Sequence, residues 1–312
     1  MYLFLRSLLF SLCLICFAVG ASGTHAATVV IVSSERSPAY VGAAEAVISE
    51  LERNGLSRYE MLQLTAEEFS TAGPLSPKLF VALGSVAASA LAKSVTVAPV
   101  LCTLLPRSSY ERILQANGRK SSSQFSALYL DQPLSRQLEL IRLAMPEVRR
   151  IGVLWGTESQ SQAAPLKTLA RARGLELVEA SVGPETLLFP ALKSILESAE
   201  VLLAMADPQV YNSNSIQNIL LASFRVHVPM VAFSPAYVRA GALVALHVTP
   251  TQLGQQAGAI AWGVLQNKTL SASPLYSRDF SVAVNEHVAR SLGLTLDGAA
   301  LRERLLRKEG AP

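Results

Sequence analysis

Short apolar runs alternate with amphipathic stretches along the first half of the chain. The apolar runs cover residues 28–33, 59–64, 78–84 and 97–105, and helical periodicity covers residues 41–53 and an Ala-rich segment that begins at Ser85. Continuous apolar runs of this length are typical of strands that are covered on both faces. Strands that alternate with helices predict a parallel sheet with right-handed crossovers.

The same pattern then occurs a second time. Its apolar runs cover residues 150–156, 175–181 and 201–207, and its helical stretches cover residues 164–173 and 216–224. In each half a proline, Pro99 or Pro229, lies at the entry of a late strand, where a missing N–H is tolerated. We therefore predict an α/β protein of two similar Rossmann-like lobes, each built on a parallel sheet.

Composition raises the question of a membrane protein. Apolar residues make up 50% of the 312 positions and charged residues 16%, below the roughly 25% of a typical soluble domain. Beyond the N-terminus, no stretch reaches the roughly 18 apolar residues that a spanning helix needs. Two buried parallel sheets account for the low charge, and a disordered chain is excluded. The net charge of +4, without a dense Lys/Arg cluster, does not indicate a nucleic-acid partner.

Residues 1–26 are typical of a secretory signal. A single charge, Arg6, precedes the apolar run of residues 7–19, and small residues lead to Ala26, near which we expect cleavage. An uncleaved anchor is the alternative. Both cysteines of this segment follow a large apolar residue, whereas a lipid-modified cysteine follows small ones, so we do not expect a lipoprotein. The mature chain is then exported.

Because the carboxyl ends of parallel strands meet at one edge of a sheet, that edge commonly binds ligands. The residues at or just after the predicted strand ends are Ser33, Ser34, Gly84, Ser85, Thr103, Trp155, Asp207, Ser234 and Tyr237. This set is rich in hydroxyl groups and aromatic rings and poor in catalytic pairs. It is the candidate ligand-binding set.

Three members of this set have two interpretations each. Ser85 is placed to cap the helix that follows, whose free N–H groups favour a carboxylate or phosphate, or it is a plain cap without a ligand. Trp155 is either a core residue or a platform on which a ligand stacks. Asp207 either starts a turn with Pro208 or holds the ammonium group of a ligand.

The chain lacks the sequence signatures of common enzymes. Residues 33–36 follow the first strand without a G-x-G-x-x-G loop, and neither a Walker A motif nor a G-x-S-x-G elbow is present. The four histidines have no metal-ligand spacing, so we expect neither a metal nor a cofactor. Cys102 lies in an apolar strand and indicates a buried hydrophobe more than a nucleophile. We expect no enzyme; an exported hydrolase using Ser85, His247 and Asp207 is the weakest alternative.

Several segments, mainly in the second half of the chain, resemble a known family. They cover residues 138–154, 219–234, 237–243, 253–257 and 284–295. Their order and spacing are similar to those of ABC-transporter substrate-binding proteins with a type I periplasmic-binding fold, in the branch that includes binders of aromatic amino acids. The chain departs from this branch at residues 104–107, where relatives carry Asp-Pro, and at residues 125–131, where they carry Thr-Gly.

The resemblance implies a division of the chain into lobes. Residues 1–26 would be the signal peptide, residues 27–131 plus 235–273 lobe 1, and residues 132–234 plus 274–312 lobe 2. Crossovers between the lobes would act as hinges, so that closure traps a ligand between the lobes.

The resemblance also implies a function. The protein would be a monomeric periplasmic binding protein that captures a small organic ligand, an amino acid or similar carboxylate, and delivers it to an inner-membrane ABC permease. In the matching turns, Gly84 and Ser85 would help to hold the ligand carboxylate, and Asp207 the ammonium. A periplasmic sensor that signals to a membrane protein without transport is the alternative. Permease and ATPase genes beside this one would favour transport.

Overall fold

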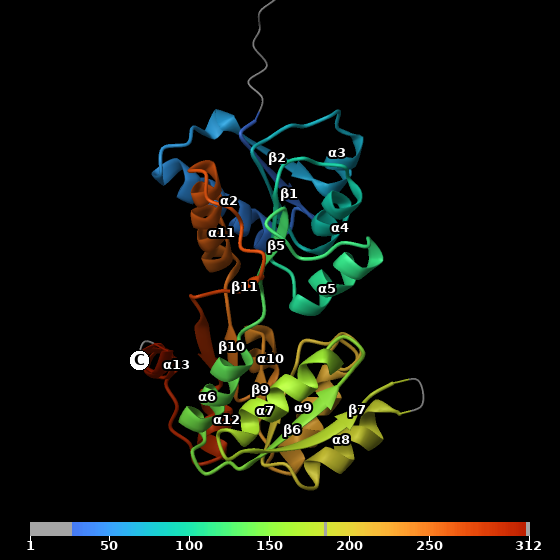
Figure 1. The fold of residues 1–312 in the computed structure, drawn as a ribbon. Coiled ribbons are helices and arrows are strands. Elements are labelled where there is room, and N and C mark those ends of the chain that lie inside the picture. Colours follow the sequence, from blue (N-terminus) through green and yellow to red (C-terminus); the bar gives the residue numbers. More distant parts are fainter. Residues whose placement is uncertain (1–26, 184–185, 310–312) are drawn as a thin grey trace, which may run out of the picture.

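The computed structural model describes residues 27–183 and 186–309. The predicted signal peptide, residues 1–26, lies outside the described residues, so its cleavage stays a prediction. The described chain forms two lobes, each built on a six-stranded sheet with helices on both faces (Figure 1).

The first sheet contains β1 (Val29–Ser33), β2 (Met61–Thr65), β3 (Leu79–Leu83), β4 (Val100–Thr103), β5 (Phe125–Tyr129) and β11 (Leu275–Tyr276). Their order is β11-β5-β4-β3-β1-β2, and all neighbours are parallel. Along β1, Val29 and Ile31 pack into the core on one face, and Val30 and Val32 into the core on the other. A strand covered on both faces has no polar side, which explains its continuous apolar run.

The second sheet contains β6 (Arg150–Trp155), β7 (Glu176–Ser181), β8 (Val201–Leu203), β9 (Met230–Ala232), β10 (Val244–His247) and β12 (Ser281–Val284). Its order is β12-β10-β9-β8-β6-β7, in which only β12 runs antiparallel to its neighbour. The order β10-β9-β8-β6-β7 repeats the order β5-β4-β3-β1-β2 of the first sheet. The predicted α/β fold of two similar lobes is confirmed.

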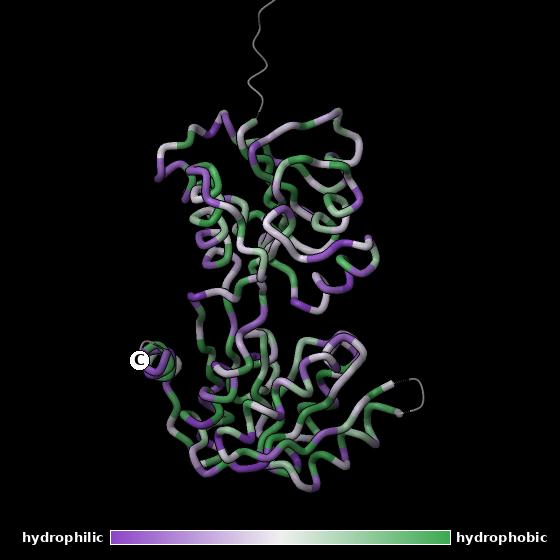
Figure 2. The backbone as a smooth tube through the Cα atoms, in the orientation of Figure 1, coloured by the Kyte–Doolittle hydropathy of each residue, from purple (hydrophilic) through white to green (hydrophobic). Residues whose placement is uncertain are grey.

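The helices divide between the lobes. The first lobe carries α2 (Pro38–Arg53), the short turn η1 (Arg58–Glu60), α3 (Ala66–Thr71), α4 (Ser85–Lys93), α5 (Arg107–Ala116) and α11 (Pro250–Leu265). The second carries α6 (Leu134–Ala144), η2 (Gln160–Gln162), α7 (Ala163–Arg171), α8 (Leu188–Leu196), α9 (Ile216–Arg225), α10 (Pro235–Ala240), α12 (Glu286–Ser291) and α13 (Gly298–Glu309). Figure 2 shows apolar positions concentrated along the inner strands of each lobe.

Helix α11 packs directly against α2 and completes the first lobe. A Cβ at Gly254 would overlap the carbonyl oxygen of Ala43, and a Cβ at Gly258 would lie 2.9 Å from the carbonyl oxygen of Val47. The two glycines therefore let the helix backbones approach closely. Between them, Ala257 lies in the core of the first lobe, although α11 directly follows a strand of the second sheet.

The described chain crosses between the lobes three times, after β5, after β10 and after β11. Two of these positions differ from the predicted boundaries. Residues 235–247, predicted in lobe 1, form α10 and β10, and β10 pairs with β9 and β12 of the second sheet. Residues 275–276, predicted in lobe 2, form β11, which pairs with β5 of the first. Pairing partners decide lobe membership, and the hydrophobic pattern does not reveal them.

A buried arginine links two of the crossovers. Arg136 of α6 is 6% exposed and donates hydrogen bonds to Gln132 Oε1 at 2.6 Å and to the carbonyl oxygen of Ser277 at 3.1 Å. It also donates to the Glu309 carboxylate at 2.8 Å, and its guanidinium carbon lies 4.2 Å from the centroid of the Phe280 ring. Because Gln132 follows β5 and Ser277 follows β11, Arg136 holds these two crossovers in register.

Candidate functional site

The carboxyl ends of the strands in the two lobes lie toward each other. Glu158 follows β6 of the second lobe, and α5 follows β4 of the first. The Glu158 carboxylate lies 2.8 Å from Arg112 Nη1 and accepts a hydrogen bond from the Ser108 hydroxyl at 3.2 Å. These contacts join the turns in which the sequence predicts ligand contacts. We call the turns at these strand ends the interlobe site.

In the first lobe, α4 begins differently from the prediction. Its N-cap is Gly84, whose φ is +87°, and Ser85 is the first helical residue, with an exposed side chain and no cap hydrogen bond. A Cβ at position 84 would lie 2.6 Å from both Ser34 Oγ and the Tyr40 hydroxyl. Glycine is therefore required at this turn, both for its positive φ and for space.

Ser34 supplies the cap that Ser85 was predicted to supply. Its hydroxyl donates to the carbonyl oxygen of Leu83 at 2.9 Å and accepts the N–H groups of Val86 and Ala87, each at 3.1 Å. Two of the free amides at the start of α4 are thus already bonded within the protein. The prediction that Ser85 caps this helix is wrong, because Ser34 caps it.

Two other predicted residues of the first lobe differ in exposure. Thr103 is fully buried, and its hydroxyl donates to the carbonyl oxygen of Leu128 at 3.0 Å. Its polar group is therefore used inside the sheet. Ser33 is partly exposed and lines a surface groove with Glu35 and Arg36, so it remains accessible from solvent.

In the second lobe, Asp207 connects two turns. It is 2% exposed. Its Oδ2 accepts the N–H of Ser159 at 2.8 Å and the Ser159 hydroxyl at 2.9 Å, and its Oδ1 accepts the N–H of Gln209 at 2.9 Å. A Cβ at Gly156 would overlap this carboxylate. The turn-forming interpretation of Asp207 therefore describes its observed contacts, and a ligand ammonium is not needed to satisfy the carboxylate.

The structure places Trp155 in the core of the second lobe. Its side chain is 1% exposed and packs with Leu166 and Val153. The indole Nε1 donates to Glu179 Oε1 at 3.0 Å. The polar end of the ring is thus bonded to β7, and Trp155 is not a stacking platform in the interlobe site.

Three aromatic side chains form a cluster where β8 and β9 end. The ring centroids of Tyr211 and Phe233 are 6.2 Å apart, and those of Phe233 and Tyr237 are 5.2 Å apart, both edge to face. Ser234 caps α10, since its hydroxyl accepts the N–H of Ala236 at 3.2 Å. This cap places the half-buried Tyr237 beside Phe233 one turn into the helix.

Four buried side-chain polar atoms among the described residues have no hydrogen-bond partner: Gln132 Nε2, Tyr211 Oη, Ser223 Oγ and His247 Nδ1. Two of them concern the strand ends of the second lobe, because Tyr211 follows β8 and His247 ends β10. Burial raises the pKa of Tyr211, so its hydroxyl stays protonated and able to donate. His247 ends β10, and strand alternation puts it on the same face as Ala245, whose core cluster includes Tyr211. Burial lowers the pKa of His247 and favours the neutral ring. Unpartnered buried polar atoms are uncommon, and either water or a polar group of a ligand would satisfy these two.

The candidate ligand-binding set does not include Tyr40, Glu158, Tyr211, Phe233 or His247, although Tyr211 follows a predicted strand end and His247 enters the hydrolase alternative. All five lie within a few residues of a strand end or the helix after it. The available signal was position alone, because a tyrosine or phenylalanine after an apolar run is equally typical of a core residue.

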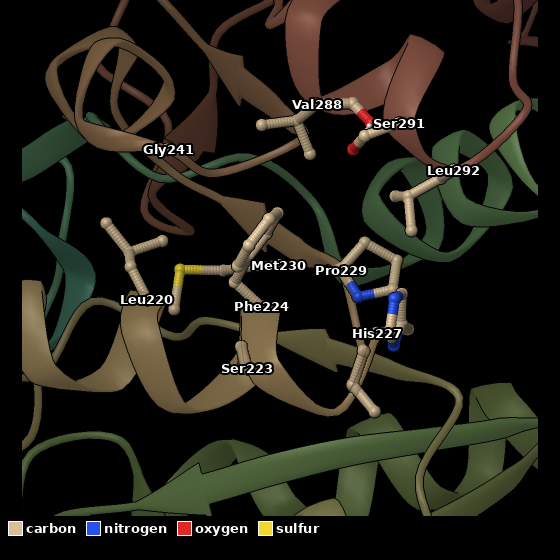
Figure 3. A pocket seen from close by; sticks show the side chains of 11 residues that line it. Leu220, Ser223, Phe224, His227, Pro229, Met230, Gly241, Val288, Ser291 and Leu292 are labelled. Atoms are coloured by element: carbon tan, nitrogen blue, oxygen red, sulfur yellow. Dashed lines mark hydrogen bonds between the residues drawn. The ribbon is translucent and has the colours of Figure 1, made fainter.

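A separate cavity lies at the opposite edge of the second sheet, at the amino end of β9 (Figure 3). Apolar side chains from α9 and from the end of α12 surround it together with Met230, among them Leu220, Phe224 and Leu292, the residue that follows α12. Its volume of about 60 Å³ holds roughly four or five water molecules. This is too little for a whole amino acid.

No group of three or more His, Cys, Asp or Glu side chains within residues 27–183 and 186–309 has a geometry suited to a metal ion. Cys102 in β4 is fully buried, as predicted, and burial raises the pKa of its thiol. Among the described helices, none is long and apolar enough to cross a bilayer.

Comparison with known proteins identifies relatives. Residues 75–306 match the model of a family described as ABC transporter substrate binding protein. A tyrosine-binding protein of Clostridioides difficile strain R20291 is 25% identical over 165 residues, which are 52% of this chain and 47% of that protein. The chain thus spans about half the length of this curated relative.

Solved structures share the fold. A ligand-free, open substrate-binding protein with adhesive properties from Clostridium difficile is 21% identical with a TM-score of 0.68, covering 86% of this chain and 95% of that one. A conserved domain protein from Vibrio cholerae is 21% identical with a TM-score of 0.61, covering 88% and 97%. An ABC domain in complex with L-Trp from Streptococcus pneumonia is 16% identical with a TM-score of 0.59, covering 90% and 99%. At these identities the likeness shows the two-lobed fold.

Proposed function

The chain belongs to the ABC transporter substrate-binding protein family, and from this premise we propose that it captures an amino acid between its two lobes and delivers it to an inner-membrane ABC permease. The family consists of binding proteins and not of enzymes. The proposal includes export of residues 27–312 to the periplasm after removal of the signal peptide, and action as a monomer.

One observation carries the proposal. Two sheets that share the order of five parallel strands turn the carboxyl ends of those strands toward each other, and three crossovers join them. Lobes joined at one side in this way can rotate about the crossovers and close on a small molecule. Tyr211 Oη and His247 Nδ1, buried on the second lobe without partners, supply hydrogen-bonding groups that only a ligand or water would satisfy.

The ligand class we propose is an amino acid with an aromatic side chain. The cluster of Tyr211, Phe233 and Tyr237 offers ring faces and edges for stacking. The N–H groups of Gly84, Val86, Ala87 and Ala88 are bonded within the protein, so the exposed hydroxyl of Ser85 and its own N–H are the groups at the start of α4 that can meet the ligand carboxylate. The names of the tyrosine-binding relative and of the L-Trp complex agree with this class.

The proposal is tested by a thermal-shift screen of residues 27–312 against the amino acids, small peptides, nucleosides and small acids, followed by calorimetry on the best compound. A ligand at 100 times its Kd stabilises the folded protein by about 2.7 kcal/mol. We expect stabilisation by an aromatic amino acid. Stabilisation by a nucleoside alone, or by no compound of these classes, contradicts the proposal.

Tyr211→Phe separates a ligand contact from a structural role. Because Tyr211 Oη has no partner in the free protein, its removal should leave the melting temperature of the free protein unchanged or higher. Loss of one hydrogen bond to the ligand should raise Kd about two- to tenfold. Tyr59→Phe, at a tyrosine that is 92% exposed, is the matched control. An unchanged Kd in Tyr211→Phe removes Tyr211 from the site.

Delivery to a permease is tested in cells. Deletion of the gene should abolish uptake of the radiolabelled ligand, and expression of the wild-type chain should restore it. Uptake that is unchanged by the deletion contradicts transport and favours the sensing alternative.

A further inference from the structure

Glu158 connects the two lobes at a distance from the crossovers. Both of its carboxylate oxygens contact the first lobe, Oε1 at 2.8 Å from Arg112 and Oε2 at 3.2 Å from the Ser108 hydroxyl. In residues 27–183 and 186–309, the other hydrogen bonds between lobes, such as that from Gln252 to Ser281, lie beside the crossovers. Glu158 therefore holds the side of the interlobe site that the crossovers leave free.

The turn that carries Glu158 is held rigidly in the second lobe. The next residue, Ser159, donates its N–H and its hydroxyl to Asp207, and the preceding residue, Thr157, donates its N–H and hydroxyl to Gln209 Oε1 at 3.0 and 2.8 Å. Glu158 is thus fixed on both sides by the turn after β8. A movement of the second lobe is transmitted directly to the Glu158 carboxylate.

The position of β6 in the sheet makes this contact sensitive to rotation of the lobes. Three strand spacings separate β6 from β10, the strand that leads into a crossover, which is about 14 Å at about 4.8 Å per strand. A rotation of about 10° about the crossover side then moves Glu158 by roughly 2.5 Å. This movement extends the contact with Arg112 past the approximately 4 Å limit of an ion pair.

We propose that Glu158, with Arg112 and Ser108, is a latch between the lobes that limits their opening in the absence of ligand. The proposal rests on the proposed function, since it takes the separation of the lobes to be the motion that admits a ligand. The latch favours closed arrangements, and it lowers the free energy that ligand contacts must supply for closure. Arg112 is 60% exposed, so salt weakens the latch.

The test combines a distance measurement with ligand binding. Spin labels at Val95→Cys in the first lobe and Phe224→Cys in the second, both exposed, report the distance between the lobes; the native Cys102 is buried and does not take a label. Glu158→Gln removes the charge and keeps the shape. Glu45→Gln, which breaks the 3.1 Å contact between Glu45 and Arg58 inside the first lobe, is the matched control.

We expect Glu158→Gln to broaden the distance distribution of the ligand-free protein toward longer distances and to raise the ligand Kd about two- to fivefold, as for an exposed ion pair. Arg112→Gln should do the same, and the double variant should add little. In 1 M salt the variants and the wild type should converge. Glu45→Gln should change neither quantity.

Two results overturn the latch. An unchanged distance distribution in Glu158→Gln shows that the contact does not limit opening, and a shift to shorter distances shows that it opposes closure. The distance measurement needs no ligand. It therefore tests the latch even if none of the compounds binds and the proposed function is rejected.

Discussion

Asp207→Asn is the substitution that best separates the two roles considered for this carboxylate. In the wild type, Oδ2 accepts two hydrogen bonds from Ser159 and Oδ1 accepts one from Gln209, all between 2.8 and 2.9 Å. An asparagine has one carbonyl oxygen in place of two carboxylate oxygens. Its NH₂ group must therefore face a backbone N–H, either that of Gln209 or that of Ser159.

The cost follows from the less damaging of these two arrangements. With the NH₂ group toward Gln209, the hydrogen bond from the Gln209 N–H to a charged acceptor on the 2%-exposed Asp207 is lost. Each such loss costs about 1.5–3 kcal/mol. We expect a decrease of about 2–3 kcal/mol in the free energy of unfolding.

The assay is urea unfolding of residues 27–312 followed by circular dichroism, with the denaturant slope fitted for every variant. Asp279→Asn, at a carboxylate that is 58% exposed, is the control and should change stability by less than about 0.5 kcal/mol. A loss below about 1 kcal/mol in Asp207→Asn, together with a Kd raised by more than about tenfold, would refute the reasoning. That pair of results would assign the carboxylate to the ligand ammonium.

Two further predictions concern a helix contact and a buried ring. Gly254→Ala should lower the free energy of unfolding by about 1–2 kcal/mol, because the new Cβ overlaps the Ala43 carbonyl oxygen and this overpacking outweighs the higher helix propensity of alanine. Gly42→Ala is the control: the space around its Cβ is open, so this variant should have a higher melting temperature than the wild type. The pKa of His247 is lowered in the folded protein by burial, so the unfolded chain binds the proton more readily and stability should fall as pH falls through the ordinary His range. In paired urea titrations at pH 7.5 and pH 5.5, His247→Gln should lose less free energy of unfolding than the wild type. Equal losses in the two proteins would contradict the conclusion that burial lowers the pKa of His247.

The pattern of apolar runs was sufficient to predict the fold. It marks strands covered on both faces, and its repetition marks two lobes, because burial on both faces leaves a strong local signal. The same pattern did not predict to which lobe the segments near the crossovers belong. Residues 235–247 look alike whether their strand pairs with the first sheet or the second, and that choice depends on partners distant in sequence.

The sequence predicted the edge of the sheets at which the site lies, but it did not predict the contacts of the individual side chains. Gly84 and Ser85 were located at the right turn, but the cap comes from Ser34, about fifty residues earlier in the chain. Asp207 was selected for its charge, while its partner Ser159 belongs to another strand-end turn. The N-terminus of a helix needs hydrogen-bond acceptors and a buried carboxylate needs donors, and the sequence shows both needs. Which residue supplies each partner depends on the fold.

The placement of α11 and β11 has a consequence for how the protein matures. The core of the first lobe includes Leu253, Ala257 and Ala261 of α11, and its sheet ends with β11. A chain that emerges from a ribosome or a secretion channel amino end first presents these segments only after the whole of the sequence that builds β6–β10. The first lobe therefore cannot complete its core and its sheet until residue 276 has emerged, so the two lobes finish folding nearly together.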